Sequence, residues 1–148
     1  MRIDYVTKVL SIVLGLLLIL MAVSQYMNMS AFSSALAQYP YLAENTRLIA
    51  VAFIVLEFLA GVMLVAGSGS TKVFSSAANV GLVVILGWFI LGAIAISSDV
   101  VIPNWALFGG FVVWPVSFWT EAILLVFAIA ALFLALQALY LKNRRGIW

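Results

Sequence analysis

Four apolar runs, each about as long as a bilayer is thick, dominate this sequence of 148 residues. A helix needs about 20 predominantly apolar residues to cross the roughly 30 Å hydrocarbon core of a membrane. The chain is 67% hydrophobic and only 8% charged, whereas an ordinary soluble domain is roughly 25% charged. We therefore expect an integral membrane protein with helices over residues 6–27, 48–66, 74–96 and 119–141.

These spans leave too little chain for a separate soluble domain, so residues 1–148 are expected to form a single membrane domain. The connection from Gly67 to Lys72 is short and rich in Gly and Ser, which makes the second and third spans antiparallel neighbours. The predicted fold is an all-α, antiparallel four-helix bundle. Close approach of neighbouring helices is expected at three glycines of the third span, Gly81, Gly87 and Gly92.

The first span has a competing interpretation as a cleaved signal peptide. Ala22, Val23 and Ser24 form a weak cleavage pattern of small residues. The apolar region is, however, longer than the 7 to 15 residues, approximately, that are typical of a signal sequence. Its length therefore favours a transmembrane helix that is retained.

Two connections carry aromatic residues that suit the membrane surface. After the first span, Phe32, Leu36 and Tyr39 recur at helical spacing before Pro40, which predicts either a short interfacial helix that ends at the proline or an ordered loop. The stretch 97–118 is apolar but interrupted by prolines and glycines, so it is not expected to span. The aromatic residues of this stretch, together with Trp119 just after it, indicate either a belt at headgroup level or a re-entrant segment packed on the bundle. They are Trp105, Phe108, Phe111, Trp114, Phe118 and Trp119.

Basic residues are distributed unequally between the two ends of the predicted bundle. Arg47 stands alone at one end, and six others lie at the opposite end: Arg2, Lys8, Lys72, Lys142, Arg144 and Arg145. By the positive-inside rule both termini are expected to face the cytoplasm. The same distribution suits orientation in a bilayer better than binding of nucleic acid, so no nucleic-acid partner is expected.

Glu57 is the one ionisable residue deep inside an apolar run. It lies about 14 Å from either end of its span, at about 1.5 Å rise per residue, and a carboxyl at that depth costs roughly 2.5 to 3.5 kcal/mol on insertion scales. It shares a helical face with Ala50 and Gly61, which predicts that it points into the bundle. Two roles remain open: a hydrogen-bonded group that fixes helix register, or a proton relay.

Three further polar residues fall near the outer ends of the predicted helices. Gln25 and Glu121 lie on the same stripes as small residues, and Arg47 begins the second span. They are either ordinary boundary residues or the lining of a polar vestibule above Glu57. The candidate ligand-binding residues are Gln25, Arg47, Trp105, Trp114 and Glu121. No catalytic residue is assigned, and Glu57 is the candidate proton relay.

Cysteine and histidine are both absent. Thiolate and imidazole ligands are therefore excluded, together with dithiol chemistry carried by this chain and haem bound through His or Cys. No metal site and no cofactor of its own are predicted. The chain is expected to be a scaffold or a binding surface rather than a self-contained catalyst.

The order of motifs in the first half resembles the DoxX/MauE superfamily of small four-helix membrane proteins. In that family a first helix that ends in a small and a polar residue precedes an F-x-x-x-L-x-x-Y segment and an E-x-x-x-G-x-x-L-x-x-G helix. The matching residues lie between Val9 and Gly67: Gly15, Ala22, Gln25, Phe32, Leu36, Tyr39, Glu57, Gly61, Leu64 and Gly67. Relatives often carry Lys or His in place of Gln25 and Gly in place of Ala22.

The resemblance implies a redox-associated protein of a prokaryotic inner or plasma membrane. The leading expectation is an accessory or structural subunit of a larger respiratory, photosynthetic or quinone-oxidoreductase complex, with quinone or lipid contact at the outer aromatic loop as a possible addition. An enzymatic role would then be that of a membrane subunit of an oxidoreductase. The alternatives are a quinone-interacting component that uses Glu57 as a proton relay and, less favoured, a small transporter.

Overall fold

The computed structural model describes residues 4–39, 42–67, 71–97, 107–108 and 117–143. Five α-helices and one short 3-10 helix occur among them: α1 (Tyr5–Met27), α2 (Met29–Leu36), η1 (Ala43–Asn45), α3 (Thr46–Gly67), α4 (Thr71–Ser97) and α5 (Phe118–Asn143). The four long helices are apolar and long enough to cross a membrane. The predicted all-α four-helix membrane bundle is confirmed, and each predicted span agrees with its helix to within three residues at either end.

Polar side chains at two helix starts supply hydrogen bonds that the first turn cannot make for itself. Asp4 precedes α1 and accepts bonds from the amide of Thr7 at 2.9 Å and from its hydroxyl at 2.7 Å. Hydrogen bonds from Thr7, first from its hydroxyl and then from its amide, hold the pKa of Asp4 below the ordinary value. Ser117 and Thr120 cap the start of α5 reciprocally, since the Ser117 amide donates to the Thr120 hydroxyl and the Thr120 amide donates to that of Ser117.

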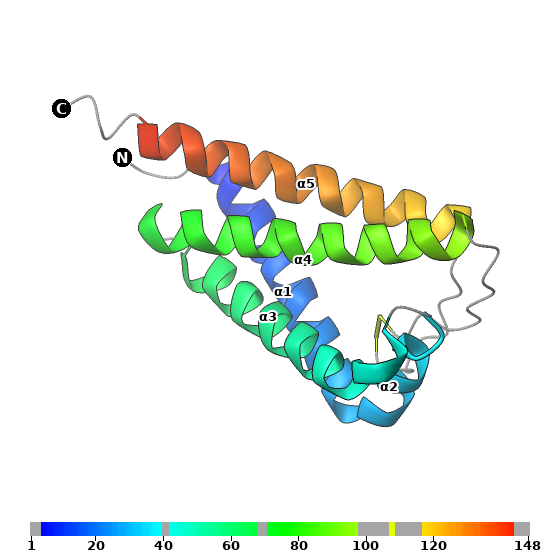
Figure 1. Ribbon diagram of the computed structural model, residues 1–148. Helices are drawn as coiled ribbons and strands as arrows, with labels where there is room; N and C mark the ends of the chain where they lie inside the picture. The colour runs from blue at the N-terminus through cyan, green and yellow to red at the C-terminus, as the bar shows by residue number, and fades with distance from the viewer. Residues whose placement is uncertain (1–3, 40–41, 68–70, 98–106, 109–116, 144–148) are drawn as a thin grey trace.

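The long helices form two pairs, α1 with α3 and α4 with α5, and contacts between α3 and α4 join the two pairs (Figure 1). The first turn of α1 and the last turn of α5 lie at the same end of the bundle, where α3 ends and α4 begins. The pairs spread apart toward the opposite end, where α2 lies, and α1 and α5 touch little. We call this opposite end the α2 end.

α2 shows that the segment after the first span contains a short helix, one of the two alternatives predicted for it. Phe32 and Leu36 are buried, as is Tyr39 after the helix, so its apolar face packs against the bundle instead of lying on lipid alone. The helix ends at Leu36, and Pro40, the expected helix stop, lies outside the described residues. The expected aromatic segment 97–118 also lies mostly outside them, including Trp105, Phe111 and Trp114.

The closest approach between helices occurs where Gly15 of α1 faces Gly61 of α3. A Cβ built on Gly15 would lie 2.8 Å from the Gly61 carbonyl oxygen, and one built on Gly61 would lie 2.7 Å from the Gly15 carbonyl oxygen. One turn away, the Ser11 hydroxyl donates to the Leu64 carbonyl at 2.8 Å. Small residues that let backbones touch are the usual source of packing energy between membrane helices, which lack a hydrophobic drive toward one another.

The glycines of α4 are less crowded. A Cβ at Gly81 would meet a Leu64 methyl at 3.3 Å, and one at Gly87 would lie in ordinary contact with the Phe53 ring at 3.7 Å. The helix–helix contact that requires missing Cβ atoms is therefore the one between Gly15 and Gly61; a Cβ at Gly67, where α3 ends, would also lie 2.9 Å from the Phe74 amide nitrogen.

Replacing Gly15 with Ala should destabilise the bundle by about 1 to 3 kcal/mol, because backbone atoms of α3 must move to admit the methyl group. Gly87→Ala is the matched control. It adds a methyl group in ordinary contact and gains up to about 1 kcal/mol of helix propensity. Unfolding by SDS titration in detergent micelles measures both, and a Gly15→Ala protein as stable as the parent chain would contradict the close contact.

Candidate functional site

Glu57 lies at the middle of α3 and is completely buried, with 0% of its surface exposed. Ala50 and Gly61, which share its helical face, are buried as well. The carboxyl therefore points into the bundle, away from lipid. Because polar groups in an apolar interior are costly unless they are hydrogen-bonded, its partners decide what it can do.

Gln25 reaches Glu57 although it lies only two residues from the end of α1. In a helix every Cα–Cβ bond tilts toward the helix N-terminus. Since α1 and α3 are antiparallel, the Gln25 side chain leans toward the bundle centre while the Glu57 side chain leans toward the α2 end. Their opposite tilts bring Gln25 Nε2 to 3.4 Å from Glu57 Oε1, a long hydrogen bond between two side chains that are both fully buried.

Trp88 of α4 provides the second and shorter bond. Its indole Nε1–H donates to the same oxygen, Glu57 Oε1, at 2.5 Å. The indole ring packs between two phenylalanine rings, with centroid distances of 5.8 Å to Phe32 of α2 and 5.0 Å to Phe53 of α3. Three transmembrane helices thus meet at one carboxyl oxygen, in a cluster that we name the Glu57 cluster: Gln25, Glu57 and Trp88.

The connection before α5 closes the Glu57 cluster on another side. Gln25 Nε2 also donates to the Leu107 carbonyl at 3.0 Å. The amide nitrogen of Gln25 therefore donates both to α3 and to the connection before α5. Leu107 is buried, and its side chain belongs to the same core as Phe32 and Trp88. The cluster is therefore enclosed by α1, α2, α3, α4 and Leu107.

Two oxygens of the cluster, Glu57 Oε2 and Gln25 Oε1, have no hydrogen-bond partner among the described residues. Among the described residues no lysine or arginine pairs with Glu57. An isolated carboxylate in an apolar interior costs far more than a hydrogen-bonded neutral group. The cluster thus binds three helices together and keeps one unused acceptor on Gln25 and one unused oxygen on Glu57.

The role of Trp88 was not predicted from the sequence. Trp is common at the two membrane surfaces, but Trp88 lies nine residues before the end of α4, roughly 14 Å deep. A buried indole N–H usually needs an acceptor. Trp88 lies well inside its helix, and the chain has one carboxyl, Glu57, well inside another. That coincidence is the sequence signal from which their pairing could have been predicted. The contribution of the Leu107 carbonyl has no such signal, because any backbone carbonyl can accept.

The other candidate residues do not join the cluster. Arg47 is exposed at the start of α3. Glu121, in the first turn of α5, is 8% exposed, and neither of its carboxyl oxygens has a hydrogen-bond partner within the described part of the chain. Trp105 and Trp114 lie outside the described residues. A polar vestibule above Glu57 stays a prediction, because residues 98–106 and 109–116 would take part in it.

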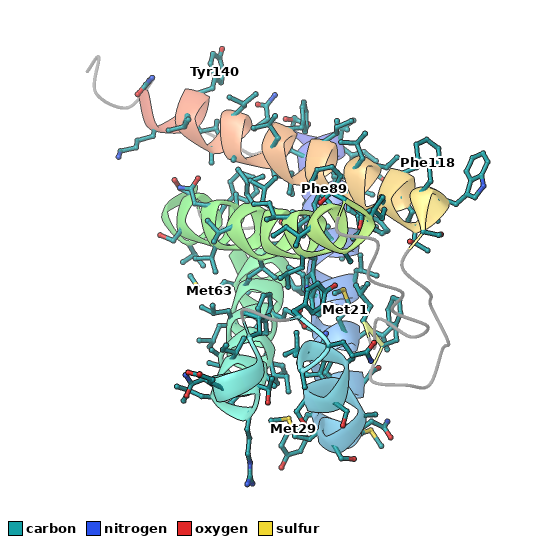
Figure 2. All side chains as sticks on the ribbon, turned by 45° about the vertical axis from the view of Figure 1, so that its right-hand side comes forward. Met21, Met29, Met63, Phe89, Phe118 and Tyr140 are labelled. Carbon is teal, nitrogen blue, oxygen red and sulfur yellow. The ribbon has the colours of Figure 1, made fainter. Side chains whose placement is uncertain are left out.

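Aromatic residues at the two ends of α5 face outward. Phe118 and Tyr140 point away from the bundle (Figure 2), and Trp119 beside Phe118 is 75% exposed. The Phe118 and Trp119 rings meet edge to face with centroids 5.7 Å apart. This arrangement suits the aromatic belts that flank a bilayer.

A small apolar cavity lies near the cluster in the part of the chain that the structure describes. An apolar cavity of about 80 Å³ lies between α1 and α5, next to Leu107 and Met21. It is smaller than the roughly 150 Å³ engineered cavity that holds benzene. The described residues also contain no group of three or more side chains that could hold a metal ion.

Comparisons with protein-family models, with curated proteins and with solved structures find no match.

Replacing Trp88 with Phe should lower the unfolding free energy by about 1 to 2 kcal/mol, because the ring packing is largely kept while Glu57 loses its shorter bond. Trp119→Phe, the same change at an exposed position, should stay within about 0.5 kcal/mol. SDS unfolding in micelles provides the comparison.

The Glu57→Leu background isolates the bond itself. There the Trp88 N–H has already lost its acceptor, so Trp88→Phe should cost nothing or be slightly stabilising. An equal cost in both backgrounds would show that the indole contributes through packing and not through Glu57.

Proposed function

We propose that this chain is an accessory, structural subunit of a larger membrane redox complex and carries no redox cofactor of its own. The observation that carries the proposal is the enclosure of the Glu57 cluster. Gln25, Glu57 and Trp88 are each 0% exposed, so these interior polar groups serve to hydrogen-bond one helix to another. A subunit of this kind acts through its outer surface.

The outer surface of the described helices is strongly apolar. Large hydrophobic side chains are exposed along α1, α3, α4 and α5, which suits contact with lipid and with the helices of partner proteins. The redox assignment rests on the resemblance of the Val9 to Gly67 region to the DoxX/MauE superfamily. The resemblance also implies a prokaryotic inner or plasma membrane. The unequal distribution of basic residues supports an orientation with both termini in the cytoplasm; the α2 end then faces outward.

Purification of the tagged chain from its native membranes in mild detergent tests the proposal. We expect larger subunits to comigrate with the chain on gel filtration, and the copurified material to show the absorbance of a redox cofactor. An unrelated small membrane protein with the same tag serves as the control. A lone monomer, or partners without any redox group, would contradict the proposal.

A second candidate function, a proton relay that serves a quinone, is favoured by one observation. Glu57 Oε2 and Gln25 Oε1 lack partners, which leaves the cluster able to accept another hydrogen-bonding group. Protonatable carboxyls inside membrane proteins do serve as relays.

Glu57→Gln distinguishes the two functions, since Gln keeps an acceptor for Trp88 and Gln25 but cannot release a proton. The structural function predicts normal assembly and quinone-coupled turnover of the complex within about twofold of the parent. A relay predicts normal assembly and a loss of about 10²-fold or more, the usual contribution of a positioned acid or base. Turnover of the purified complex with a soluble quinone decides between them.

A further inference from the structure

Two oppositely charged side chains line one hollow at the α2 end. Glu44 of η1 and Arg47 of α3 border it together with Asn45, Thr46 and Leu48. Both charged side chains are exposed. Although they stand three residues apart, they form no ion pair with each other or with any other described residue. Both charges are thus available to a ligand at the level where lipid headgroups meet the helix ends.

An apolar strip leads from this hollow along α3. Leu48, Val51, Val55 and Leu59 follow at spacings of three and four residues, so they share one helical face, and all four are exposed. Val51 also borders the hollow. The strip connects the two charges with the membrane interior.

The strip ends in a groove between α1 and α3. Its volume is about 350 Å³, and it is lined by apolar side chains and the Tyr26 ring: Ala22, Val23, Tyr26, Ile54, Val55, Phe58 and Leu59. From Arg47 to Leu59 the helix rises about 18 Å, close to half of the roughly 30 Å hydrocarbon core. The combined length matches one leaflet.

We propose that this surface binds a phospholipid whose headgroup carries a primary ammonium, as in phosphatidylethanolamine. Arg47 binds the phosphate, for which a guanidinium provides paired N–H donors. Glu44 accepts hydrogen bonds from the ammonium, and one acyl chain lies along Val51 and Val55 into the groove between α1 and α3. The inference is independent of the proposed function.

The pair of charges selects among headgroups. A quaternary ammonium, as in phosphatidylcholine, has no N–H with which to bind Glu44, whereas a primary ammonium has three. An anionic headgroup without an amine, as in phosphatidylglycerol, satisfies Arg47 but brings no cation to Glu44. Discrimination between headgroups with identical acyl chains is therefore the signature of this site.

Native mass spectrometry of the full chain in detergent, with the three lipids carrying the same acyl chains, tests the proposal. The parent chain should retain phosphatidylethanolamine about fivefold better than phosphatidylcholine, the effect of one solvent-accessible charged contact. Glu44→Gln should remove this preference by lowering phosphatidylethanolamine alone. Arg47→Gln should lower both lipids alike, because both carry a phosphate.

Two further variants complete the design. Val55→Trp fills the groove and should lower retention of all three lipids. Lys142→Gln, at an exposed lysine of the opposite end, should change none of them. Equal retention of the two zwitterionic lipids, stronger binding of phosphatidylglycerol, or a preference that survives Glu44→Gln would each overturn the proposal.

Discussion

A carboxyl buried among membrane helices must find its hydrogen-bond donors within the protein, and this requirement organises the bundle. Water is absent from the bilayer core, so an unsatisfied polar group there costs several kcal/mol. Glu57 meets the requirement at one oxygen, with donors from α1 and α4. The bonds connect both halves of the molecule, because α1 belongs to one helix pair and α4 to the other. The carboxyl thus joins three helices through hydrogen bonds.

Close packing of α1 on α3 is the condition for that arrangement. Gly15 and Gly61 let the two backbones touch, and the antiparallel run then tilts Gln25 and Glu57 toward each other. Toward the α2 end the pairs diverge, and the space around Trp88 is occupied by Phe32 and Leu107. Three features therefore follow one another along the bundle, from its converging end to the α2 end. They are the contact between Gly15 and Gly61, the hydrogen-bonded Glu57 cluster, and the apolar side chains of Phe32 and Leu107.

Much of the fold follows from periodicity, and the site follows only in part. The helix lengths and the inward direction of Glu57 could be predicted from each helix alone. The length of an apolar run sets the first, and the face that Glu57 shares with Ala50 and Gly61 sets the second, without knowledge of the neighbouring helices. Gln25 could be placed near Glu57 only as one of two alternatives, and the bond from Trp88 could not be predicted, since both depend on side-chain tilt and on which helices become neighbours. The close contact of Gly15 with Gly61 depends on how the two helices cross, which periodicity along one helix does not give. Approach at Gly81 of α4 is less tight, with a Cβ 3.3 Å from a Leu64 methyl.

The central claim is that the Glu57 cluster is a sealed structural junction, closed to water and to substrate. Hydrogen–deuterium exchange of the tryptophan indole N–H groups, followed by NMR in micelles or nanodiscs, tests it most directly. A Trp88 N–H that is buried and bonded to Glu57 should exchange orders of magnitude more slowly than that of exposed Trp119. Exchange of Trp88 as fast as that of Trp119 would mean that water reaches the carboxyl and would contradict the claim.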